Sequence, residues 1–324
     1  MTERTYSNTW TIASSPHLGR KDSVATIMYW VAGTLLLPTL GALYYFRGNA
    51  LRVILITVVS ALLSEFIVLK IRKKDTGAVF DGSALVTGLL LALTLPPSLK
   101  SSYCVIGAAA AIIFGKQLFG GLGSNIFNPA LVGRAFLQAA FPIAMTTWTP
   151  TALMEKVDAI TFATPLGGFK FSHALTELKP MILGNIGGCL GETSALLVLV
   201  GALVLIYKGY MDWKIPAGIL FTVFLFTGTL HLLSPLKYAS PLFHLFGGGL
   251  FLGAFYMATD MVTSPRSSLG TWIYAIFIGL LVVVIRIFGG LPEGVMYSIL
   301  IVNTFVPILD RYIKPKIFGE GAKR

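Results

Sequence analysis

The sequence predicts an all-α integral membrane protein of about ten transmembrane helices, arranged as two inverted five-helix repeats. Its composition, the spacing of its apolar runs and an internal similarity predict this fold. Of the 324 residues, 55% are hydrophobic and only 12% are charged. A soluble domain carries about 25% charged residues, so this chain lacks the polar residues needed to cover a water-facing surface. The composition therefore excludes a soluble enzyme, a disordered chain, a coiled coil and a disulfide scaffold.

Ten apolar segments provide the predicted helices. A spanning helix needs about 20 mostly apolar residues. The candidates in chain order are 26–46, 51–69, 83–96, 102–115, 127–145, 194–207, 215–233, 242–259, 271–288 and 293–309. The third and fourth are short for a complete span. In transporters, short or interrupted segments of this kind meet near the membrane midplane and form binding sites.

An internal similarity at an offset of 169 residues divides the ten segments into five and five. The run Leu118-Phe-Gly-Gly-Leu122 matches Ile287-Phe-Gly-Gly-Leu291, and Thr94-Leu-Pro96 falls on Thr263-Ser-Pro265. The same shift aligns the first two apolar segments with the sixth and seventh. An odd number of helices per repeat places the two halves in opposite orientations.

Lysine and arginine residues indicate the orientation of the chain. With a cytoplasmic N-terminus, sixteen of the 25 basic residues fall in the predicted inside segments and eight in the outside ones. This excess favours both termini inside, and it explains the net charge of +11 better than nucleic-acid binding does. The predicted organisation is a cytoplasmic tail 1–25, a first repeat 26–145, an external loop 146–180, a second repeat 181–310 and a cytoplasmic tail 311–324. The polar residues 1–23 lack the pattern of a signal peptide.

Ionisable residues within or beside the apolar segments are candidates for function, because burying a charge in lipid costs several kcal/mol. They are Glu65, Asp81, Lys116, Arg134, Glu192, Asp260 and Arg286. We expect Asp81 and Lys116 to lie at the membrane interface. Asp260, with the neighbouring hydroxyls of Thr259, Thr263 and Ser264, offers hard oxygens that suit a small cation, and with Glu192 it is a candidate for an ion path.

The glycine-rich stretch 184–194 opens the sixth segment and contains Gly191, Glu192 and Thr193. One interpretation is a helix N-cap with an acid near the positive end of the helix dipole. The other is a ligand contact, since such a helix start presents backbone N–H groups to an anion such as phosphate. The two cysteines, Cys104 and Cys189, are expected to be small core residues. No nucleophile–base pair, metal-ligand spacing or phosphate-binding loop is evident, so no catalytic or metal-binding residue is predicted.

The stretch Gly115-Lys-Gln-Leu-Phe-Gly-Gly-Leu-Gly-Ser-Asn-Ile-Phe-Asn-Pro-Ala-Leu-Val-Gly-Arg-Ala-Phe136 resembles the RnfD family, the D subunits of the Rnf ion-translocating electron-transport complex. The B subunit of the sodium-pumping NADH:quinone reductase is related. The resemblance extends to Asp81-Gly-Ser-Ala-Leu-Val-Thr-Gly88, Gly191-Glu-Thr-Ser194, Thr259-Asp-Met-Val-Thr-Ser-Pro265 and Ser15-Pro-His17, and covers essentially the whole chain.

The resemblance implies a urea-channel-like helix bundle in a bacterial or archaeal inner or plasma membrane. It implies FMN joined through its phosphate to Thr164, at the end of a motif that includes Asp158, Thr161 and Ala163. Riboflavin or a second flavin is a further expected cofactor. The expected partners are membrane lipid, the other Rnf subunits, above all the membrane-anchored FMN subunit, and a flavin transferase. The implied activity is electron transfer between ferredoxin and NAD coupled to Na⁺ or H⁺ translocation. A stand-alone small-solute channel, or a scaffold subunit without flavin, remains the alternative.

Overall fold

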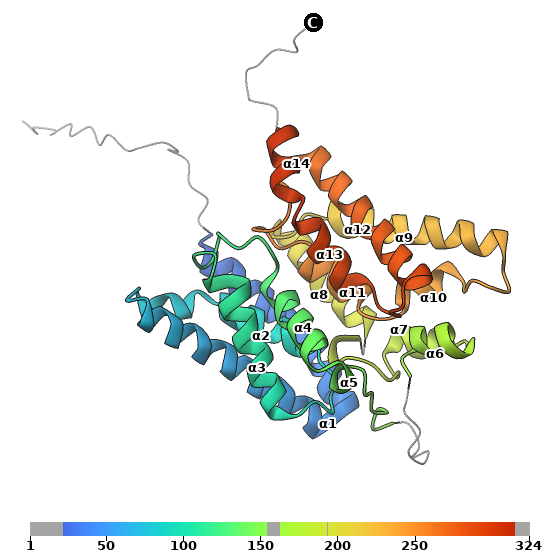
Figure 1. The fold of residues 1–324 in the computed structure, drawn as a ribbon, viewed down its shortest axis with the longest axis horizontal. Coiled ribbons are helices and arrows are strands. Elements are labelled where there is room, and N and C mark those ends of the chain that lie inside the picture. Colours follow the sequence, from blue (N-terminus) through green and yellow to red (C-terminus); the bar gives the residue numbers. More distant parts are fainter. Residues whose placement is uncertain (1–21, 154–162, 193, 315–324) are drawn as a thin grey trace, which may run out of the picture.

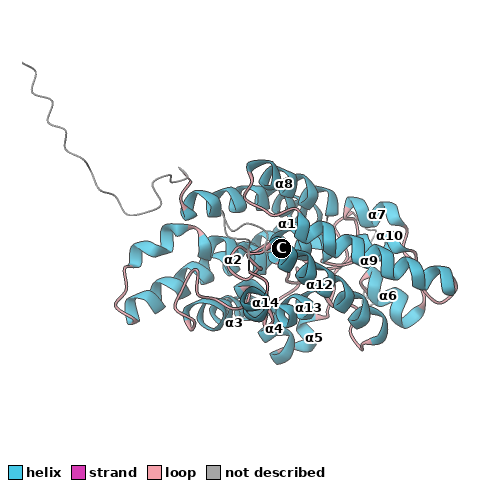
Figure 2. Ribbon diagram, turned by 90° about the horizontal axis from the view of Figure 1, so that it is seen from above, coloured by secondary structure: helices cyan, strands magenta, loops and turns pink. Residues whose placement is uncertain are grey.

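A computed structural model describes residues 22–153, 163–192 and 194–314, in which the secondary structure is helical and no strand occurs (Figure 2). The elements in chain order are α1 (Val24–Ile71), η1 (Thr76–Asp81), α2 (Ser83–Leu93), α3 (Ser101–Ile112), η2 (Ile113–Gln117), α4 (Pro129–Ala140), α5 (Pro142–Met145), α6 (Pro165–Ser172), α7 (Leu178–Leu183), η3 (Leu190–Glu192), α8 (Ala195–Lys208), α9 (Lys214–Leu233), α10 (Pro241–Phe246), α11 (Leu250–Leu252), η4 (Gly253–Met257), α12 (Ser268–Phe288), α13 (Val295–Asn303) and α14 (Val306–Tyr312).

Helix α1 consists of two helical arms that meet at Arg47. The backbone there leaves helical geometry, with φ of 49° and ψ of −127°. A left-handed φ is uncommon for a residue with a Cβ, and one such residue suffices to redirect the chain. The first two predicted segments, 26–46 and 51–69, therefore occupy separate arms of one element. Both arms begin a compact N-terminal half, because α1 packs against α2 and α3.

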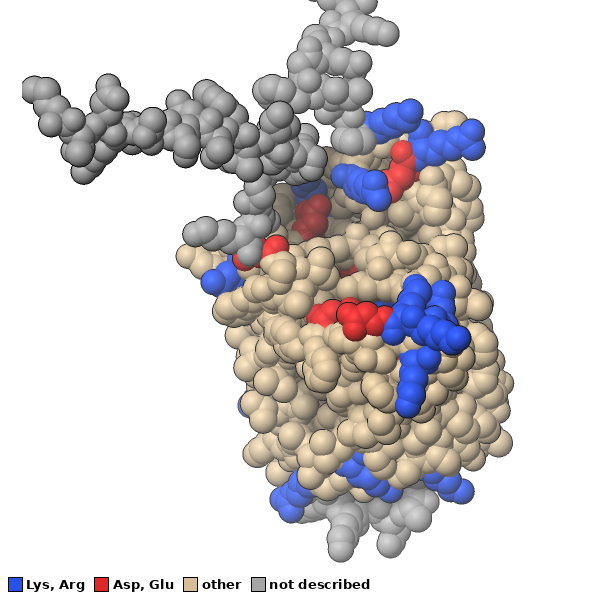
Figure 3. All heavy atoms as spheres, turned by 90° about the vertical axis from the view of Figure 1, so that its left-hand side faces the viewer, with Lys and Arg blue, Asp and Glu red and all other residues tan. Residues whose placement is uncertain are grey.

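The predicted apolar segments are helical in the structure, since helical residues cover part of each of the ten. Within the part of the chain that the structure describes, α1, α9 and α12 are long and apolar enough to cross a membrane. Large hydrophobic side chains are exposed along these same helices, for example Leu40, Phe221 and Phe277. Figure 3 shows charged side chains gathered in a few groups, with broad uncharged surface between them. These features are those of a membrane protein, as the composition predicts.

The two halves of the chain lie side by side. In Figure 1 the helices from α1 to α5 occupy one side of the molecule and those from α8 to α14 the other. Helix α1 packs against α8, and α4 packs against α13, so the halves share one hydrophobic core. The described ends of the chain, the start of α1 and α14, lie on the upper side in Figure 1, whereas α5 and α6 lie on the lower side.

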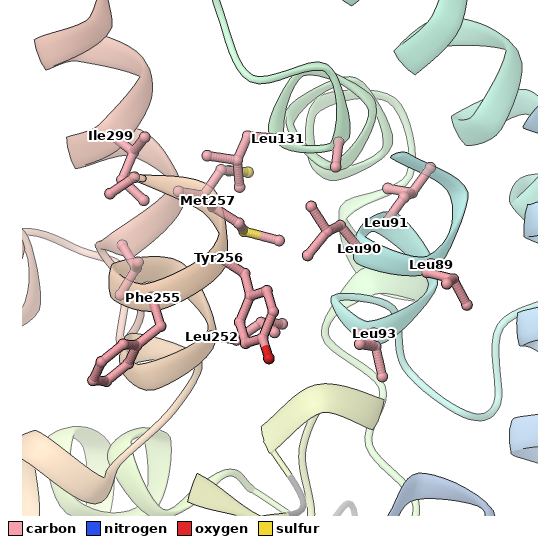
Figure 4. Close-up of a cluster of buried hydrophobic side chains, with 14 of the residues drawn as sticks. Leu89, Leu90, Leu91, Leu93, Leu131, Leu252, Phe255, Tyr256, Met257 and Ile299 are labelled. Carbon is pink, nitrogen blue, oxygen red and sulfur yellow. The ribbon is translucent and has the colours of Figure 1, made fainter. Parts of the chain in front are cut away.

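Short, interrupted helices meet at the centre of this core. Figure 4 shows leucines of α2 facing α11 and η4, which carry Leu252, Tyr256 and Met257. Helix α11 continues into the π-helical turn η4, and α3 continues in the same way into η2. Gly191 lies where the end of α2 meets α11, because a Cβ there would come 2.9 Å from the Leu93 carbonyl oxygen and 2.8 Å from Leu252 Cδ2.

Candidate functional site

Thr164 begins helix α6. Its Oγ1 accepts a hydrogen bond from the Gly167 backbone N–H at 3.1 Å, which is an N-cap contact. Pro165 follows at the first helical position, where its fixed φ suits the helix and its missing N–H costs nothing. Thr164 is 2% exposed, so its side chain is buried and its hydroxyl has a fixed position in the helix cap.

Helix α6 is anchored to the end of α12. The Lys170 amine donates to the carbonyl oxygens of Arg286 at 2.8 Å and Leu291 at 3.0 Å, and also to that of Gly289. A cation at the carboxyl end of a helix is stabilised by the exposed carbonyls there. Leu166, from the first turn of α6, packs in a small hydrophobic cluster separate from the main core. These contacts fix Thr164 relative to the second half of the chain.

A pocket of about 420 Å³, here called the Thr164 pocket, opens beside Thr164. Its walls carry three aromatic rings, those of Trp148, Phe171 and Tyr297, together with one charged group from each half, Arg134 and Glu293. Aromatic walls accommodate a flat ring system, and a guanidinium attracts negative charge. The pocket therefore suits a planar molecule that also carries polar groups.

A buried group of charged side chains lies behind the Thr164 pocket. Arg134 Nη2 donates to Glu293 Oε2 at 2.7 Å, joining α4 to the loop before α13. Arg286 donates to the carbonyl oxygens of His244 at 2.5 Å and Gly247 at 2.9 Å. Among the described residues, neither carboxylate oxygen of Glu192 has a hydrogen-bond partner, although the residue is only 7% exposed.

A second buried ion pair lies in the first half of the chain. The Lys116 amine donates to Glu65 Oε1 at 2.5 Å and to Ser83 Oγ at 2.5 Å, and Gln117 donates to the same Glu65 oxygen at 2.9 Å. Lys116 is 2% exposed, so its amine lies inside the protein and not on its surface. A buried lysine needs a counter-charge, which Glu65 provides. Asp81, by contrast, is partly exposed.

The residues predicted from sequence fall in three places. Ala163 and Thr164 both line the Thr164 pocket. Gly191 and Glu192 are buried, and Ser194 caps α8 through the Leu197 N–H at 3.2 Å, as the first interpretation of that stretch expects. Asp158, Thr161 and Thr193 lie outside the described residues.

Asp260 lines a different cavity, of about 90 Å³, together with Lys116, Asn125 and Asn128. Its carboxylate accepts hydrogen bonds from the Val262 N–H at 3.3 Å and Thr263 Oγ1 at 3.4 Å. Asp260 and Glu192 are thus not brought to one site. Sequence reasoning missed Glu293, because the run Pro292-Glu-Gly294 looks like an ordinary polar turn.

Comparison with known proteins identifies the family. The model of the NQR2, RnfD, RnfE family matches residues 11–319. The chain belongs to this family. A family member from Clostridium ljungdahlii, the D subunit of a proton-translocating ferredoxin:NAD(+) oxidoreductase complex, is 42% identical over 322 residues, which cover 96% of this chain and 97% of that relative.

Two further members of the family are similar over nearly their full lengths. The D subunit of the Na(+)-translocating ferredoxin:NAD(+) oxidoreductase complex of Acetobacterium woodii is 42% identical over 313 residues, covering 95% of each chain. The D subunit of the ion-translocating oxidoreductase complex of Stutzerimonas stutzeri is 39% identical over 333 residues, covering 94% of each chain. The family expected from the Asn-Pro-Ala-Leu block is therefore confirmed.

Proposed function

We propose that this chain is the D-type membrane subunit of an ion-translocating ferredoxin:NAD oxidoreductase complex, and that it carries FMN bound covalently to Thr164. The observation that carries the proposal is the position of Thr164 on the wall of a pocket of about 420 Å³. The names of the relatives support the complex, and the family resemblance supports the flavin. The chain has no complete active site of its own in this proposal, because electrons pass between subunits.

The side chains around the Thr164 pocket fit a tethered flavin. A phosphoester on Thr164 would hold the cofactor, and Trp148, Phe171 and Tyr297 would flank its flat ring system. Arg134 would stabilise negative charge on the ring, since its guanidinium keeps its charge at every physiological pH. When bound, the flavin supplies the electron-transfer chemistry, and this chain's residues orient it and exclude water from one side.

The membrane arrangement in this proposal is two inverted five-helix repeats in a urea-channel-like bundle. The two side-by-side halves and the interrupted helices at the centre of Figure 4 support it. The distribution of lysine and arginine supports cytoplasmic termini and an external face for Thr164. The membrane is the inner or plasma membrane of a bacterium or archaeon.

The proposed partners follow from the same function. Another membrane-anchored FMN subunit of the complex would exchange electrons with the flavin on Thr164, and a flavin transferase would attach that flavin during maturation.

A second flavin, such as riboflavin, and an ion path along Asp260 belong to the same proposal. Asp260, Asn125 and Asn128 line a common cavity, which supports a polar site there.

The experiment is expression with the flavin transferase, followed by a denaturing gel viewed for flavin fluorescence and by intact-mass measurement. Wild type should fluoresce and gain the mass of FMN less one water. Thr164→Ala should lose both signals, whereas Thr146→Ala, which removes another hydroxyl of the same pocket, should keep them. A dark wild-type band, or fluorescence that survives in Thr164→Ala, rejects the flavin assignment. Solute uptake by the isolated subunit in liposomes would favour a channel instead.

A further inference from the structure

A second pocket, of about 210 Å³ and here called the basic pocket, lies between α6, α10, the loop after α9 and the end of α12. Figures 1 and 2 show α6, α9 and α10 on the same side of the molecule. The basic pocket shares no lining residue with the Thr164 pocket, so the proposed flavin site does not account for it. It is therefore a separate candidate site.

Four basic side chains line the basic pocket, and none of the described residues that line it is acidic. The four are Lys170, His173, Lys237 and His244. Lys170 already donates to the three carbonyl oxygens at the end of α12, so it contributes charge rather than a free donor. The Lys237 amine lies 5.4 Å from the centre of the Tyr238 ring and donates no hydrogen bond to another described residue, so its N–H donors are available. These charges favour an anionic ligand.

His244 is a buried polar side chain on the wall of the basic pocket. It is 4% exposed, and neither of its ring nitrogens has a hydrogen-bond partner among the described residues. A neutral imidazole carries one N–H donor and one acceptor, and burying them without partners is costly. Its backbone is held in place, because Arg286 Nη1 donates to the His244 carbonyl oxygen at 2.5 Å. A ligand with hydrogen-bonding oxygens in the pocket would satisfy the imidazole N–H.

The basic pocket lies at the level where the hydrocarbon layer of a membrane would end. Helices α9 and α12 have 20 and 21 residues. At 1.5 Å per residue each is about 30 Å long, which is the thickness of that layer. The pocket is formed by the last residues of α12 and by the loop that follows α9. Beside it, the apolar side chains of Leu232, Leu233 and Leu236 are largely exposed. Lysine next to exposed leucines is typical of a surface that contacts both lipid tails and headgroups.

We propose that the basic pocket binds the phosphate group of an anionic phospholipid, with its acyl chains lying along the exposed leucines after α9. Lys237 and the His244 ring would donate to the phosphate oxygens, and Lys170 would add charge. Two lysines without an acid in the lining favour a headgroup of net negative charge over a zwitterionic one. The bound phosphate would join α6 to the loop after α9. Free phosphate offers the same oxygens, so the experiment has to separate the two sources.

The test uses the purified complex in phosphatidylcholine nanodiscs that contain a trace of photoreactive phosphatidylglycerol, with peptide mass spectrometry to locate the crosslinks. We expect crosslinks within residues 232–238. Photoreactive phosphatidylcholine, the zwitterionic control, should label this segment at least about fivefold less. Glycerol phosphate and inorganic phosphate, added at constant ionic strength, should not compete. Equal labelling by the two probes, crosslinks that fall on another subunit instead, or competition by either soluble phosphate overturns the lipid site.

A pair of variants provides the second measurement. Lys237→Gln removes an exposed cation of the basic pocket and should lower labelling by phosphatidylglycerol about fivefold. Lys179→Gln changes an exposed lysine that does not line the pocket and should leave labelling unchanged. Both side chains are on the surface, so both variants should fold. If Lys237→Gln is labelled as strongly as Lys179→Gln, the proposal is refuted. Neither measurement depends on flavin, so the outcome is independent of the flavin assignment.

Discussion

Removing the charge of Lys116 should destabilise the protein more than any change to an exposed lysine. Lys116 and Glu65 are each 2% exposed and their charged atoms are 2.5 Å apart. The substitution Lys116→Met keeps most of the side-chain volume and deletes the cation. Among the described residues, Glu65 is then left buried with a single remaining donor, the Gln117 amide.

The expected magnitude follows from the distance and the burial. Opposite unit charges at this distance attract by about 7 kcal/mol at an effective dielectric constant of about 20. Desolvation of several kcal/mol for each ion offsets this attraction, so the intact pair adds little net stability. Breaking it by removing one partner costs about 3–5 kcal/mol, because the other charge stays buried and uncompensated. The double variant Glu65→Met with Lys116→Met removes both charges and should cost much less than the sum of the two single variants.

A thiol-reactive fluorophore provides the assay, because Cys104 and Cys189 are both free and buried and become reactive only on unfolding. The protein is heated, and the midpoint temperature of unfolding is read from the fluorescence. A loss of 1 kcal/mol lowers this temperature by about 2 °C, the low end of the range for folded domains, so Lys116→Met should lower it by roughly 6–10 °C. Lys100→Met, which changes an exposed lysine at the start of α3, is the matched control. Equal midpoints for Lys116→Met and the control, or additive costs in the double variant, would refute the buried-pair reasoning.

Two further predictions concern packing around the site. Gly191→Ala places a Cβ 2.9 Å from the Leu93 carbonyl oxygen and should cost about 1–3 kcal/mol through overpacking. Gly290→Ala, with nothing within 4 Å, should be tolerated, so equal thermal midpoints would contradict the packing argument. Lys170→Met removes a charged donor from three carbonyl oxygens at the end of α12 and should cost about 1.5–3 kcal/mol. The exposed-lysine variant Lys179→Met is its control, and a Lys170→Met midpoint no lower than this control would show that the contacts do not hold α6.

The helical segments were predictable from the sequence because the signals for them are local. A long apolar run predicts a helix in a membrane whatever lies elsewhere in the chain, and helices cover part of every predicted segment. Helix starts are equally local. Asn128 caps α4 through the Ala130 N–H, and Pro129 occupies the first helical position, so this helix start depends on neighbouring residues alone. The order of such motifs also sufficed to identify the family.

The charge pairs were not predictable, and Lys116 is the clearest case. The lysine follows an apolar run and looks like an interfacial residue, yet its partner Glu65 lies 51 positions earlier in the chain. No local pattern connects two residues at that separation. The pairing depends on α1 packing against α3, which brings the second arm of α1 beside η2.

The same distinction holds at the candidate site. From the sequence alone come a membrane-embedded helical chain, its family and a candidate attachment threonine in the segment 146–180, which the sequence predicts to be a loop. Only the tertiary structure decided that Thr164 lines a pocket shared with Arg134 and Glu293, and that Glu192 lies buried close to Glu293. The physical reason is that hydrophobicity and helix capping act over neighbouring residues. The free energy of a buried charge instead depends on groups that the fold brings together from distant parts of the chain.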